Sequence, residues 1–583
     1  MNESEAAGGD SWQWYQGVMR SWLEMPDQME SPSLNMSSLK MDQAFVIGAS
    51  EKDIALYSVS DDCFRCPFEL QQRVGAGAEA RWVAGTARRA TWRVYSGATE
   101  QFLSSRNTTG LVCQLRPSLG QFGMYRLNVT ADNNCYLTTL KEPVNIYTPL
   151  LLLLGVVLAV SFLYGIVKLI LSRVRKTGKL RYGDKELAIK QRLRALDTFR
   201  GMAIVFMIFV NDGAGGYWWL QHATWNGLAA GDLVFPAFLW IMGVCIPLSV
   251  KSAFAKGEPR WSVLRNIVRR SVIMFLLGVS LNTVYGSNSL QEIRVFGVLQ
   301  RLAVSYFIAA GFYTLTSSKY YTPPRQGACA QALKDLLSCC WCWVLGAALV
   351  AVHCVVTFTV HHPDCPPGYL GPGGRHDDWA AVNCSGGAAG YLDRLLLGER
   401  HLFQNSEAKD VYGGVNMDPE GLLGCLTSTF QVILGIQSGA TVLYQRSHKA
   451  RVSRWLAAAL LLAAAGGLLA GFTRDHGLLP INKNLWSLSF VLVTSACCLA
   501  LLSLCYTFTD ALHIWGGGPF RSPGLNAIAL YVGHSLCSHL FPFHWKLPNM
   551  NTHTMHLVEA AWGTLLWIII AHVMAKKKVF ISL

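Results

Sequence analysis

The sequence predicts a polytopic α-helical membrane protein with about eleven transmembrane helices and a mostly-β domain at its N-terminus. Hydrophobic residues make up 51% of the 583 residues and charged residues only 15%, whereas soluble domains carry about 25% charge. Mean hydropathy is +0.28, and apolar blocks of roughly 20 residues, long enough to cross a bilayer, recur along the chain. The basic excess, a net charge of +14, lies in short loops between these blocks, as membrane orientation requires. A soluble enzyme, a disordered chain and a nucleic-acid-binding domain are therefore excluded.

Residues 1–148 are polar and are expected to form a small β domain. Turn residues separate short alternating stretches such as 125–130, a pattern typical of strands with one buried face. Glycosylation sequons and cysteines in the same stretch indicate an oxidising lumen or exterior. The sequons lie at Asn35, Asn107 and Asn128, and the cysteines are Cys63, Cys66, Cys113 and Cys135.

The spacing of these cysteines leaves their pairing open. Cys63 and Cys66 also have the spacing of half a zinc site or a redox pair, but no second pair at zinc spacing follows, so we favour structural disulfides. Residues 1–10 have neither the basic start nor the apolar core of a signal peptide. We therefore expect either that the true start lies upstream of this chain or that the first membrane helix directs translocation.

The first membrane helix is predicted over 149–172, and it sets the orientation of the chain. The loop 173–195 that follows contains nine basic residues against two acidic ones. The positive-inside rule places this loop in the cytosol and the N-terminal domain in the lumen. The sequons of the N-terminal domain agree with that orientation.

Ten further helices are predicted to form a transmembrane domain over 196–583. If successive helices alternate in direction, basic segments such as 446–454 and 576–578 fall in the cytosol, together with the C-terminus. An insertion at about 361–419 falls in the lumen, where the sequon at Asn383 and the pair Cys365 and Cys384 fit an oxidising compartment. The predicted ranges are 196–212, 231–250, 264–284, 295–315, 340–360, 420–445, 455–472, 486–507, 522–541 and 557–574.

Polar side chains within membrane spans are candidates for function, because leaving them without partners is costly. Asp197 and Arg200 are three residues apart at the predicted cytosolic mouth of the second span, so one helix face brings them together and leaves Arg200 facing inward. An interfacial ion pair is the alternative interpretation. With other donors expected at similar depth, Arg200 could hold a phosphate-bearing ligand that enters from the cytosol. These donors are Arg192, Arg194, Gln300 and Arg301.

A second polar group gathers at the predicted lumenal ends of the spans. His222 lies among aromatic residues there; such a histidine is often merely interfacial, but imidazole, with a reference pKa of about 6.5, is also suited to proton transfer. Asn211 and Asp212 precede the glycine-rich turn 213–216. No H-E-x-x-H, paired C-x-x-C or acidic calcium loop occurs, so we expect no metal. Other residues that we expect near the same cavity are Trp225, Asn226, Asp232, Asn482, Lys483, Asn484 and His534.

Eight motifs, in order along the chain, carry a resemblance to a known family. They include Leu196-Asp-Thr-Phe-Arg-Gly201, Gln221-His-Ala-Thr-Trp-Asn-Gly227 and Ile481-Asn-Lys-Asn-Leu-Trp-Ser-Leu-Ser489, and the others lie at 232–236, 297–302, 368–374, 386–398 and 418–421. In these motifs and their order, from about residue 39 onward, the chain resembles the lysosomal transmembrane acetyltransferase family. The N-terminal domain matches the family only loosely.

The resemblance implies an enzyme of the lysosomal membrane that moves acetyl from cytosolic acetyl-CoA to the terminal non-reducing glucosamine of heparan sulfate. The basic residues would then hold the CoA phosphates. His222 would act as general base on the sugar amine or would carry the acetyl group as an acyl-imidazole, and the sequence leaves both routes open. Asn211 matches the family's asparagine before the turn and would stabilise an oxyanion, while Asp212 would orient His222.

As partners we expect acetyl-CoA, a heparan sulfate oligosaccharide, membrane lipid and a second copy of the chain in a homodimer. Two other functions stay as alternatives: an acyltransferase for another lumenal or extracellular glycan, with a changed acceptor pocket, and a secondary sugar transporter. Transporters are often built from two related halves. The run 197–236 has no counterpart in the second half of the chain, which disfavours the transporter.

Overall fold

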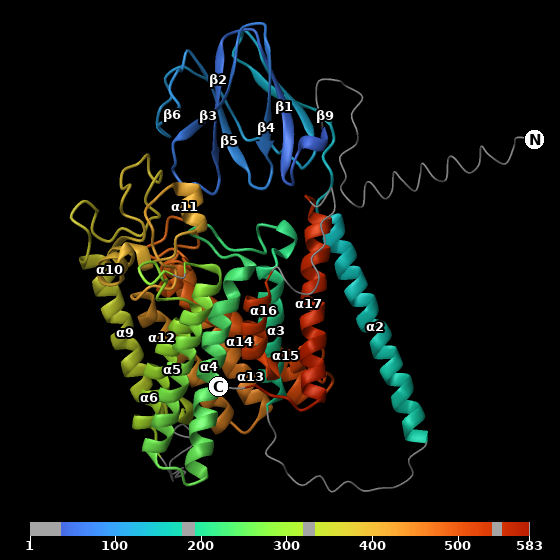
Figure 1. Cartoon of the computed structure of the whole chain (residues 1–583), viewed down its shortest axis with the longest axis vertical. Helices are drawn as coiled ribbons and strands as arrows, with labels where there is room; N and C mark the ends of the chain where they lie inside the picture. The colour runs from blue at the N-terminus through green and yellow to red at the C-terminus, as the bar shows by residue number, and fades with distance from the viewer. Residues whose placement is uncertain (1–35, 178–192, 288, 319–332, 539–550, 582–583) are drawn as a thin grey trace, which may run out of the picture.

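The structure is a computed structural model that describes residues 36–177, 193–287, 289–318, 333–538 and 551–581. It consists of a β domain seated on one end of a helical bundle (Figure 1). Among the described residues, nine helices are long and apolar enough to cross a membrane, and the predicted fold class is confirmed. Two of the eleven predicted spans, 196–212 and 522–541, correspond to helices outside these nine, so the number eleven stays a prediction.

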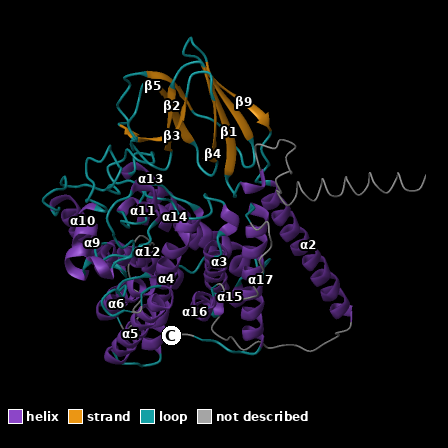
Figure 2. Ribbon diagram, turned by 45° about the horizontal axis from the view of Figure 1, so that its top comes forward, coloured by secondary structure: helices purple, strands orange, loops and turns teal. Residues whose placement is uncertain are grey.

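The β domain is a sandwich of two sheets (Figure 2). Its sheets have the strand orders β4-β1-β8-β9 and β6-β3-β2-β5-β7, and every pairing is antiparallel except β1 with β8. Val46 and Leu127 from the first sheet pack against Leu56 and Trp92 from the second, which is how a sandwich buries one face of each sheet. The strands are β1 (Gln43–Ser50), β2 (Ile54–Ser60), β3 (Phe68–Val74), β4 (Glu79–Gly85), β5 (Ala90–Ser96), β6 (Phe102–Leu103), β7 (Leu111–Leu115), β8 (Met124–Val129) and β9 (Cys135–Lys141).

The six cysteines expected to be oxidised form three disulfides, and Cys63 pairs with Cys66; that this pair is structural stays a prediction. Cys113 of β7 pairs with Cys135 of β9 and thereby links the two sheets. Cys365 pairs with Cys384 in the insertion.

The helices alternate in direction, which defines two ends of the bundle. At the β-domain end, α3 finishes at Asn211 and α4 begins at Val234; at the opposite end, α3 begins at Arg194 and α4 finishes at Ala255. Within the described residues, the α-helices are α2 (Thr148–Thr177), α3 (Arg194–Asn211), α4 (Val234–Ala255), α5 (Arg260–Tyr285), α6 (Val298–Thr316), α8 (Lys334–Leu337), α9 (Cys340–Thr359), α10 (Gly387–Leu397), α11 (Glu407–Tyr412), α12 (Gly424–Tyr444), α13 (His448–Leu469), α14 (Leu488–Tyr506), α15 (Arg521–Leu525), α16 (Ala527–Cys537) and α17 (His553–Lys576).

The centre of the bundle is formed by α4, α12 and α14. Between 67% and 78% of the residues in the apolar segments of these helices are buried, whereas the share is 22% in α5, α9 and α13 at the periphery. At the crossing of α4 and α12, a Cβ added to Gly243 or Gly435 would lie 3.0 Å from the Cα of the other glycine. Small residues at such a crossing let two membrane helices approach backbone to backbone.

Helix α2 lies at the edge of the bundle beside α17 (Figure 1). Leu150 and Leu153 near its start pack partly against the bundle, but most of its other apolar side chains are exposed, with Leu151, Phe162 and Tyr164 at 65%, 69% and 69%. A helix that is hydrophobic all round is stable in lipid and not in water. We therefore infer that lipid covers α2.

The β domain rests on the insertion between α9 and α12. The Tyr412 hydroxyl of α11 donates a hydrogen bond to the Asp62 carbonyl at 2.6 Å and accepts one from the Phe64 amide at 3.1 Å. The Asp378 carboxylate accepts hydrogen bonds from the amide and hydroxyl of Ser105 at 2.9 and 2.8 Å. Segments far apart in the sequence thus form one cap over the β-domain end of the bundle.

Candidate active site

The loop between α3 and α4 presents His222 at the β-domain end of the bundle. This loop folds back on itself because the carboxylate of Asp232 accepts hydrogen bonds from the amides of Ala223 and Ala229, at 3.1 and 2.9 Å. The Gly231 amide also donates to the Gln221 carbonyl at 3.1 Å. The position of His222 is therefore set by backbone contacts on both sides of it.

Asp232 also holds the imidazole of His222. Its Oδ1 lies 2.9 Å from Nδ1 of His222, and the carboxylate is fully buried while the imidazole is 33% exposed. An ionised carboxylate can only accept a hydrogen bond. Nδ1 therefore carries the proton of the neutral ring, and Nε2 has the free lone pair that a general base or nucleophile needs.

A second segment, 481–487, brings Lys483 to the same carboxylate. Asn482 and Asn226 form a backbone bridge, and their side chains are hydrogen-bonded at 3.0 Å. Asn484 donates to the Thr224 carbonyl at 3.3 Å. This pairing places the Lys483 ammonium 3.6 Å from Oδ1 of Asp232, where its charge stabilises the ionised carboxylate.

The remaining expected residues of this group have structural contacts. The buried Trp225 donates to the Leu370 carbonyl at 3.0 Å, and Asn226 donates to Asp475 at 2.9 Å. We expected Asp212 to orient His222, but Asp232 occupies that position, and Asp212 instead lies 3.8 Å from Nε2 of His534. Sequence spacing could not separate the two aspartates because both are close to His222 along the chain.

The glycine-rich turn 213–216 seats the loop against neighbouring elements. Gly216 has a φ of +79°, and a Cβ there would lie 2.6 Å from the Met41 side chain. The Gly215 carbonyl accepts a hydrogen bond from His553 at 2.8 Å, and the other ring nitrogen of His553 lies 3.0 Å from Asp42. The turn thus packs on the β domain and α17.

An inner cavity of about 460 Å³ runs through the bundle to His222. Its wall near His222 includes Asn211, Lys483 and Glu420, and its far part includes Arg200 and Arg270. From Arg200 to Asn211, α3 rises by eleven residue steps, or roughly 16.5 Å at about 1.5 Å per residue. Apolar side chains line the length between: Ile204, Met207, Val210, Phe235, Phe238, Ile241 and Met242.

An outer cavity of about 730 Å³ lies between the β domain and the bundle, and His222 lines it as well. Its wall is formed by the turn between β4 and β5, the segment 117–121, the loop after α3 and Arg474. His222 therefore lies where the two cavities meet. A group that arrives from each side could reach the same imidazole.

The far part of the inner cavity contains two arginines. Arg200 lies 3.8 Å from Asp197, as predicted, and lines the cavity. Arg270 of α5, which sequence reasoning missed, donates to the Tyr306 hydroxyl at 3.2 Å. The Arg194 side chain is exposed at the helix start, while its amide binds Asp510. Arg192 lies outside the described residues.

The prediction that Gln300 and Arg301 lie at the same mouth as Arg200 is wrong. Both are at the start of α6, which is at the β-domain end, and both are fully buried. Gln300 donates to the Val295 carbonyl at 3.0 Å. Arg301 donates to the Gly421 carbonyl at 2.8 Å and stacks over Trp486 at 4.9 Å. Successive spans run in opposite directions through the bundle. The first turn of α6 therefore lies at the β-domain end, whereas the first turn of α3 lies at the opposite end.

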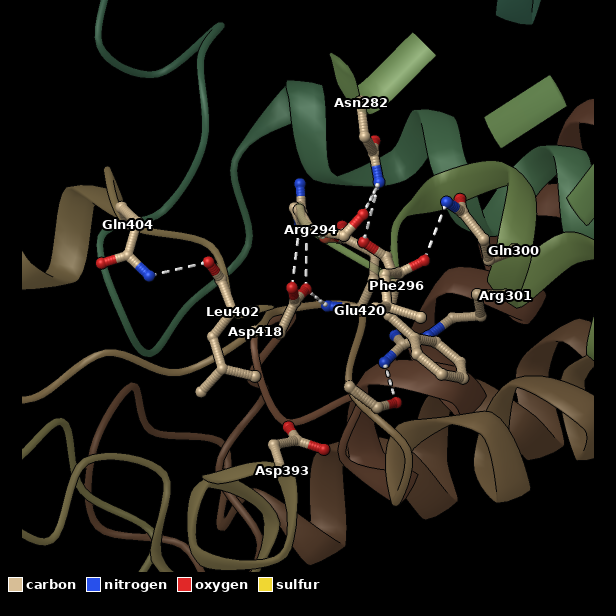
Figure 3. Close-up of polar contacts among 12 residues, drawn as sticks. Asn282, Arg294, Phe296, Gln300, Arg301, Asp393, Leu402, Gln404, Asp418 and Glu420 are labelled. Carbon is tan, nitrogen blue, oxygen red and sulfur yellow. Dashed lines mark hydrogen bonds and ion pairs between the residues drawn. The ribbon is translucent and has the colours of Figure 1, made fainter. Parts of the chain in front are cut away.

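Arg301 belongs to a buried ionic cluster (Figure 3), and Glu420 of this cluster lines the inner cavity. Arg294 forms ion pairs with Asp418 at 2.6 Å and with Glu420 at 2.5 Å. Asp393 lies beside these ion pairs, and its carboxylate accepts a hydrogen bond from the Leu422 amide at 2.9 Å. Burial raises the pKa of Asp393 to about 7, because the low-dielectric surroundings disfavour a further negative charge.

We expect the folded protein to be more stable at pH 5 than at pH 7.5, partly because of Asp393. Its carboxyl has a pKa of 3.8 when unperturbed and about 7 in the fold, so between these values only the folded state holds the proton. Stability then falls as the pH rises through about 7. Melting temperatures of wild type and Asp393→Asn across this range should show a weaker dependence in the variant. An unchanged dependence would contradict the assignment, and Asp364→Asn, at a side chain 80% exposed, is the control.

The predicted glycosylation sites within the described residues, Asn107, Asn128 and Asn383, all lie in the β domain or the insertion and are at least partly exposed. Asn35 lies outside the described residues. In the part of the chain that the structure describes, no group of three or more His, Cys, Asp and Glu side chains is arranged to hold a metal. The expectation of no metal stays a prediction.

The chain is similar in sequence to known proteins. Residues 192–323 match the model of the catalytic region of heparan-alpha-glucosaminide N-acetyltransferase. The chain is 34% identical to the Mus musculus protein named heparan-alpha-glucosaminide N-acetyltransferase, over 97% of this chain and 92% of the relative. It is also 34% identical to the Homo sapiens protein of the same name, over 93% of this chain and 88% of the relative.

Proposed function

Because this chain belongs to the heparan-alpha-glucosaminide N-acetyltransferase family, we propose that it transfers acetyl from acetyl-CoA to the amine of a terminal glucosamine of heparan sulfate. The observation that carries this proposal is that His222 lines both the inner and the outer cavity. A cytosolic thioester and a lumenal glycan lie on opposite sides of the membrane. A reaction between them needs a reactive group that both substrates can reach.

The inner cavity suits the donor. Arg200 and Arg270 offer guanidinium groups for phosphate oxygens at its far part, a pairing in which arginine binds with two parallel hydrogen bonds. The apolar wall beyond them suits the thin pantetheine arm of CoA. An arm extended along α3 would bring the thioester towards Asn211 and His222.

The outer cavity suits the acceptor, and His222 suits the proton transfer between the two substrates. The amine nitrogen attacks the thioester carbonyl carbon, the new N–C bond forms, and the C–S bond breaks with the electron pair on sulfur. Nε2 of His222 takes the proton from the amine and returns it to the thiolate. If His222 attacks first, Nε2 bonds to the same carbonyl carbon and the C–S bond breaks, so that CoA leaves as the thiolate. The amine then attacks the acetyl carbon and the N–C bond to Nε2 breaks; Nε2 takes the proton that the amine loses, and that proton balances the charge of the thiolate.

Other side chains of the site have supporting roles in this proposal. Asn211 would donate a hydrogen bond to the oxyanion that forms on the thioester carbonyl. Asp232, held ionised by Lys483 and two amides, would stabilise the imidazolium that forms during transfer. The reaction in this form uses no metal.

We further propose the setting of the reaction. The chain would be a multi-pass protein of the lysosomal membrane, with the β domain and the insertion lumenal and the C-terminus cytosolic. The three described sequons at the β-domain end and the disulfides there support this orientation, since both modifications belong to oxidising compartments. We also propose that the protein forms a homodimer and that it binds no metal.

The proposal is tested with the full-length protein purified in detergent, labelled acetyl-CoA and a glucosamine acceptor. We expect label on the acceptor amine. If the protein binds acetyl-CoA but transfers nothing to glucosamine, another acceptor replaces it; if it does not bind acetyl-CoA, a sugar transporter becomes the better hypothesis.

Arg200→Ala is expected to raise the KM for acetyl-CoA about tenfold and to leave kcat and the acceptor KM within about twofold. One charge-assisted hydrogen bond contributes about 1.5–3 kcal/mol, and the phosphates bind far from the reacting atoms. Initial rates at varied acetyl-CoA measure the effect. The control is Arg265→Ala, at an exposed arginine on α5, which should leave all constants unchanged; an unchanged KM in Arg200→Ala would remove Arg200 from the donor site.

A further inference from the structure

The outer cavity has a feature that transfer of acetyl to a bare amine does not require. Three arginines line it, two from the turn between β4 and β5 and one from the loop between α13 and α14: Arg88, Arg89 and Arg474. Two aspartates, Asp61 and Asp62, also line it. The charges of these arginines and aspartates sum to +1, and His222 lines the same cavity.

We propose that Arg88 and Arg474 bind an anionic group of the acceptor chain, a sulfate or a uronate carboxylate, on a sugar next to the reacting glucosamine. This inference rests on the proposed function. It assigns the β domain a direct part in acceptor recognition, because Arg88 belongs to that domain.

Arg88 is held in one orientation. Its guanidinium lies 4.1 Å above the ring of Trp218, which comes from the loop after α3. Its Nε lies 2.8 Å from the Asp62 carboxylate, which fixes one edge of the guanidinium. A planar guanidinium stacked on an aromatic ring and fixed at one edge loses little entropy when it binds an oxyanion.

Burial also makes Arg88 receptive to an anion. The side chain is 24% exposed, and burial lowers the pKa of its guanidinium from the usual value. An incompletely solvated cation gains more from an anionic ligand than one already surrounded by water. Exposed arginines of the β domain lack this advantage.

Arg474 approaches the same carboxylate from the bundle. Its Nε donates to the Asn226 carbonyl at 3.1 Å, its Nη1 donates to the Asp61 carbonyl at 3.2 Å, and its Nη2 lies 3.5 Å from Asp62. Asp62 thus lies between two arginines, one from each part of the molecule. A ligand anion between the same arginines would contact both the β domain and the bundle.

The size of the cavity agrees with more than one sugar unit. Its volume of about 730 Å³ falls in the range of about 300–1,000 Å³ that holds drug-sized ligands. The terminal glucosamine would occupy the part next to His222. The next sugar of the chain would then lie between the β domain and the loop after α3.

The test compares three acceptors with the full-length protein. They are a glucosaminide with a neutral aromatic aglycone, a glucosamine–uronic acid disaccharide, and the same disaccharide with a sulfate on the uronic acid. Arg88→Ala and Arg474→Ala should each raise the KM of the anionic acceptors about tenfold, which corresponds to about 1.4 kcal/mol. Both should leave the neutral glucosaminide and kcat within about twofold. Sulfate recognition predicts the larger change for the sulfated disaccharide, and carboxylate recognition predicts equal changes for both.

The controls separate binding from folding and from the proposed function. Arg106→Ala removes the same charge from a β-domain side chain that is 82% exposed and should change no constant. Arg88→Lys keeps a cation beside Asp62 but loses the planar fork, so it should raise the anionic KM by a smaller factor even if Arg88→Ala does not fold. Equal changes for neutral and anionic acceptors, or none for either, would overturn the subsite alone. Wild type that acetylates none of the three would overturn the proposed function and the subsite with it.

Discussion

Replacement of His222 by alanine is expected to lower kcat/KM by about 10²–10⁴, the contribution typical of a positioned general base. The loss follows from position, since His222 is the imidazole that lines both cavities and has Nδ1 occupied by Asp232. Transfer of label from acetyl-CoA to a glucosamine acceptor measures it. Because the imidazole is only partly buried, the variant should fold, and its melting temperature and its binding of acetyl-CoA should match wild type.

The same protein distinguishes the two routes that the residues leave open. Quenched before acceptor is added, wild type should hold label on the protein if His222 carries the acetyl group, and none if it acts as a base. His222→Ala should hold none in either case. Transfer by His222→Ala at the wild-type rate would contradict both routes and would place the chemistry elsewhere in the cavity.

Asp232→Asn is expected to lower kcat by about 10²–10⁴ while the KM values for both substrates change little. The amide can donate a hydrogen bond to Nδ1, which favours the tautomer with the proton on Nε2, the nitrogen that must accept one. The neutral amide also no longer stabilises an imidazolium. Steady-state rates with both substrates varied separate the kcat effect from binding.

Asp212→Asn is the matched comparison, because it makes the same chemical change close to the same loop. Asp212 lies against His534 and not at the position that holds Nδ1 of His222, so we expect a much smaller change in kcat. A larger loss in Asp212→Asn than in Asp232→Asn would contradict the roles that the structure assigns to the two carboxylates. Melting temperatures of both variants should be compared, since Asp232 also binds two loop amides.

Local patterns predicted much of the fold because their causes are local. Nine of the predicted spans correspond to helices that meet the length and hydropathy of membrane helices, and the alternating stretch at 125–130 is strand β8. The basic loop after α2 and the sequons could be read directly from the sequence. Two other cases, α3 and α16, show the limit of this approach. Helix α3 has 18 residues but three of them, Arg194, Asp197 and Arg200, are charged, and α16 has only 11 residues, so neither combines the length and the apolar composition of the other spans.

Local patterns predicted some residues of the candidate site and misplaced others, because residue type is local information whereas position in the bundle is not. His222, Asn211, Lys483 and Arg200 all line the inner cavity, as their residue types suggested. Gln300 and Arg301 are polar in an apolar segment, but that pattern does not say which end of the bundle they occupy. Arg301 belongs instead to the buried cluster with Arg294, Asp418 and Asp393 (Figure 3), and Gln300 donates to the Val295 carbonyl.

The sequence by itself determined that this chain is a membrane protein with a β domain, which cysteines are oxidised, and that His222 is a candidate for catalysis. These conclusions depend on hydropathy, spacing and residue chemistry within a few turns of chain. Only the tertiary structure decided that Asp232 orients His222 and that Lys483, 251 residues further along the chain than Asp232, forms an ion pair with Asp232. It also decided that Arg88 of the β domain lines the same cavity as Arg474 of the bundle. Such pairings depend on how distant segments pack, and no local pattern encodes which of several aspartates or arginines will meet.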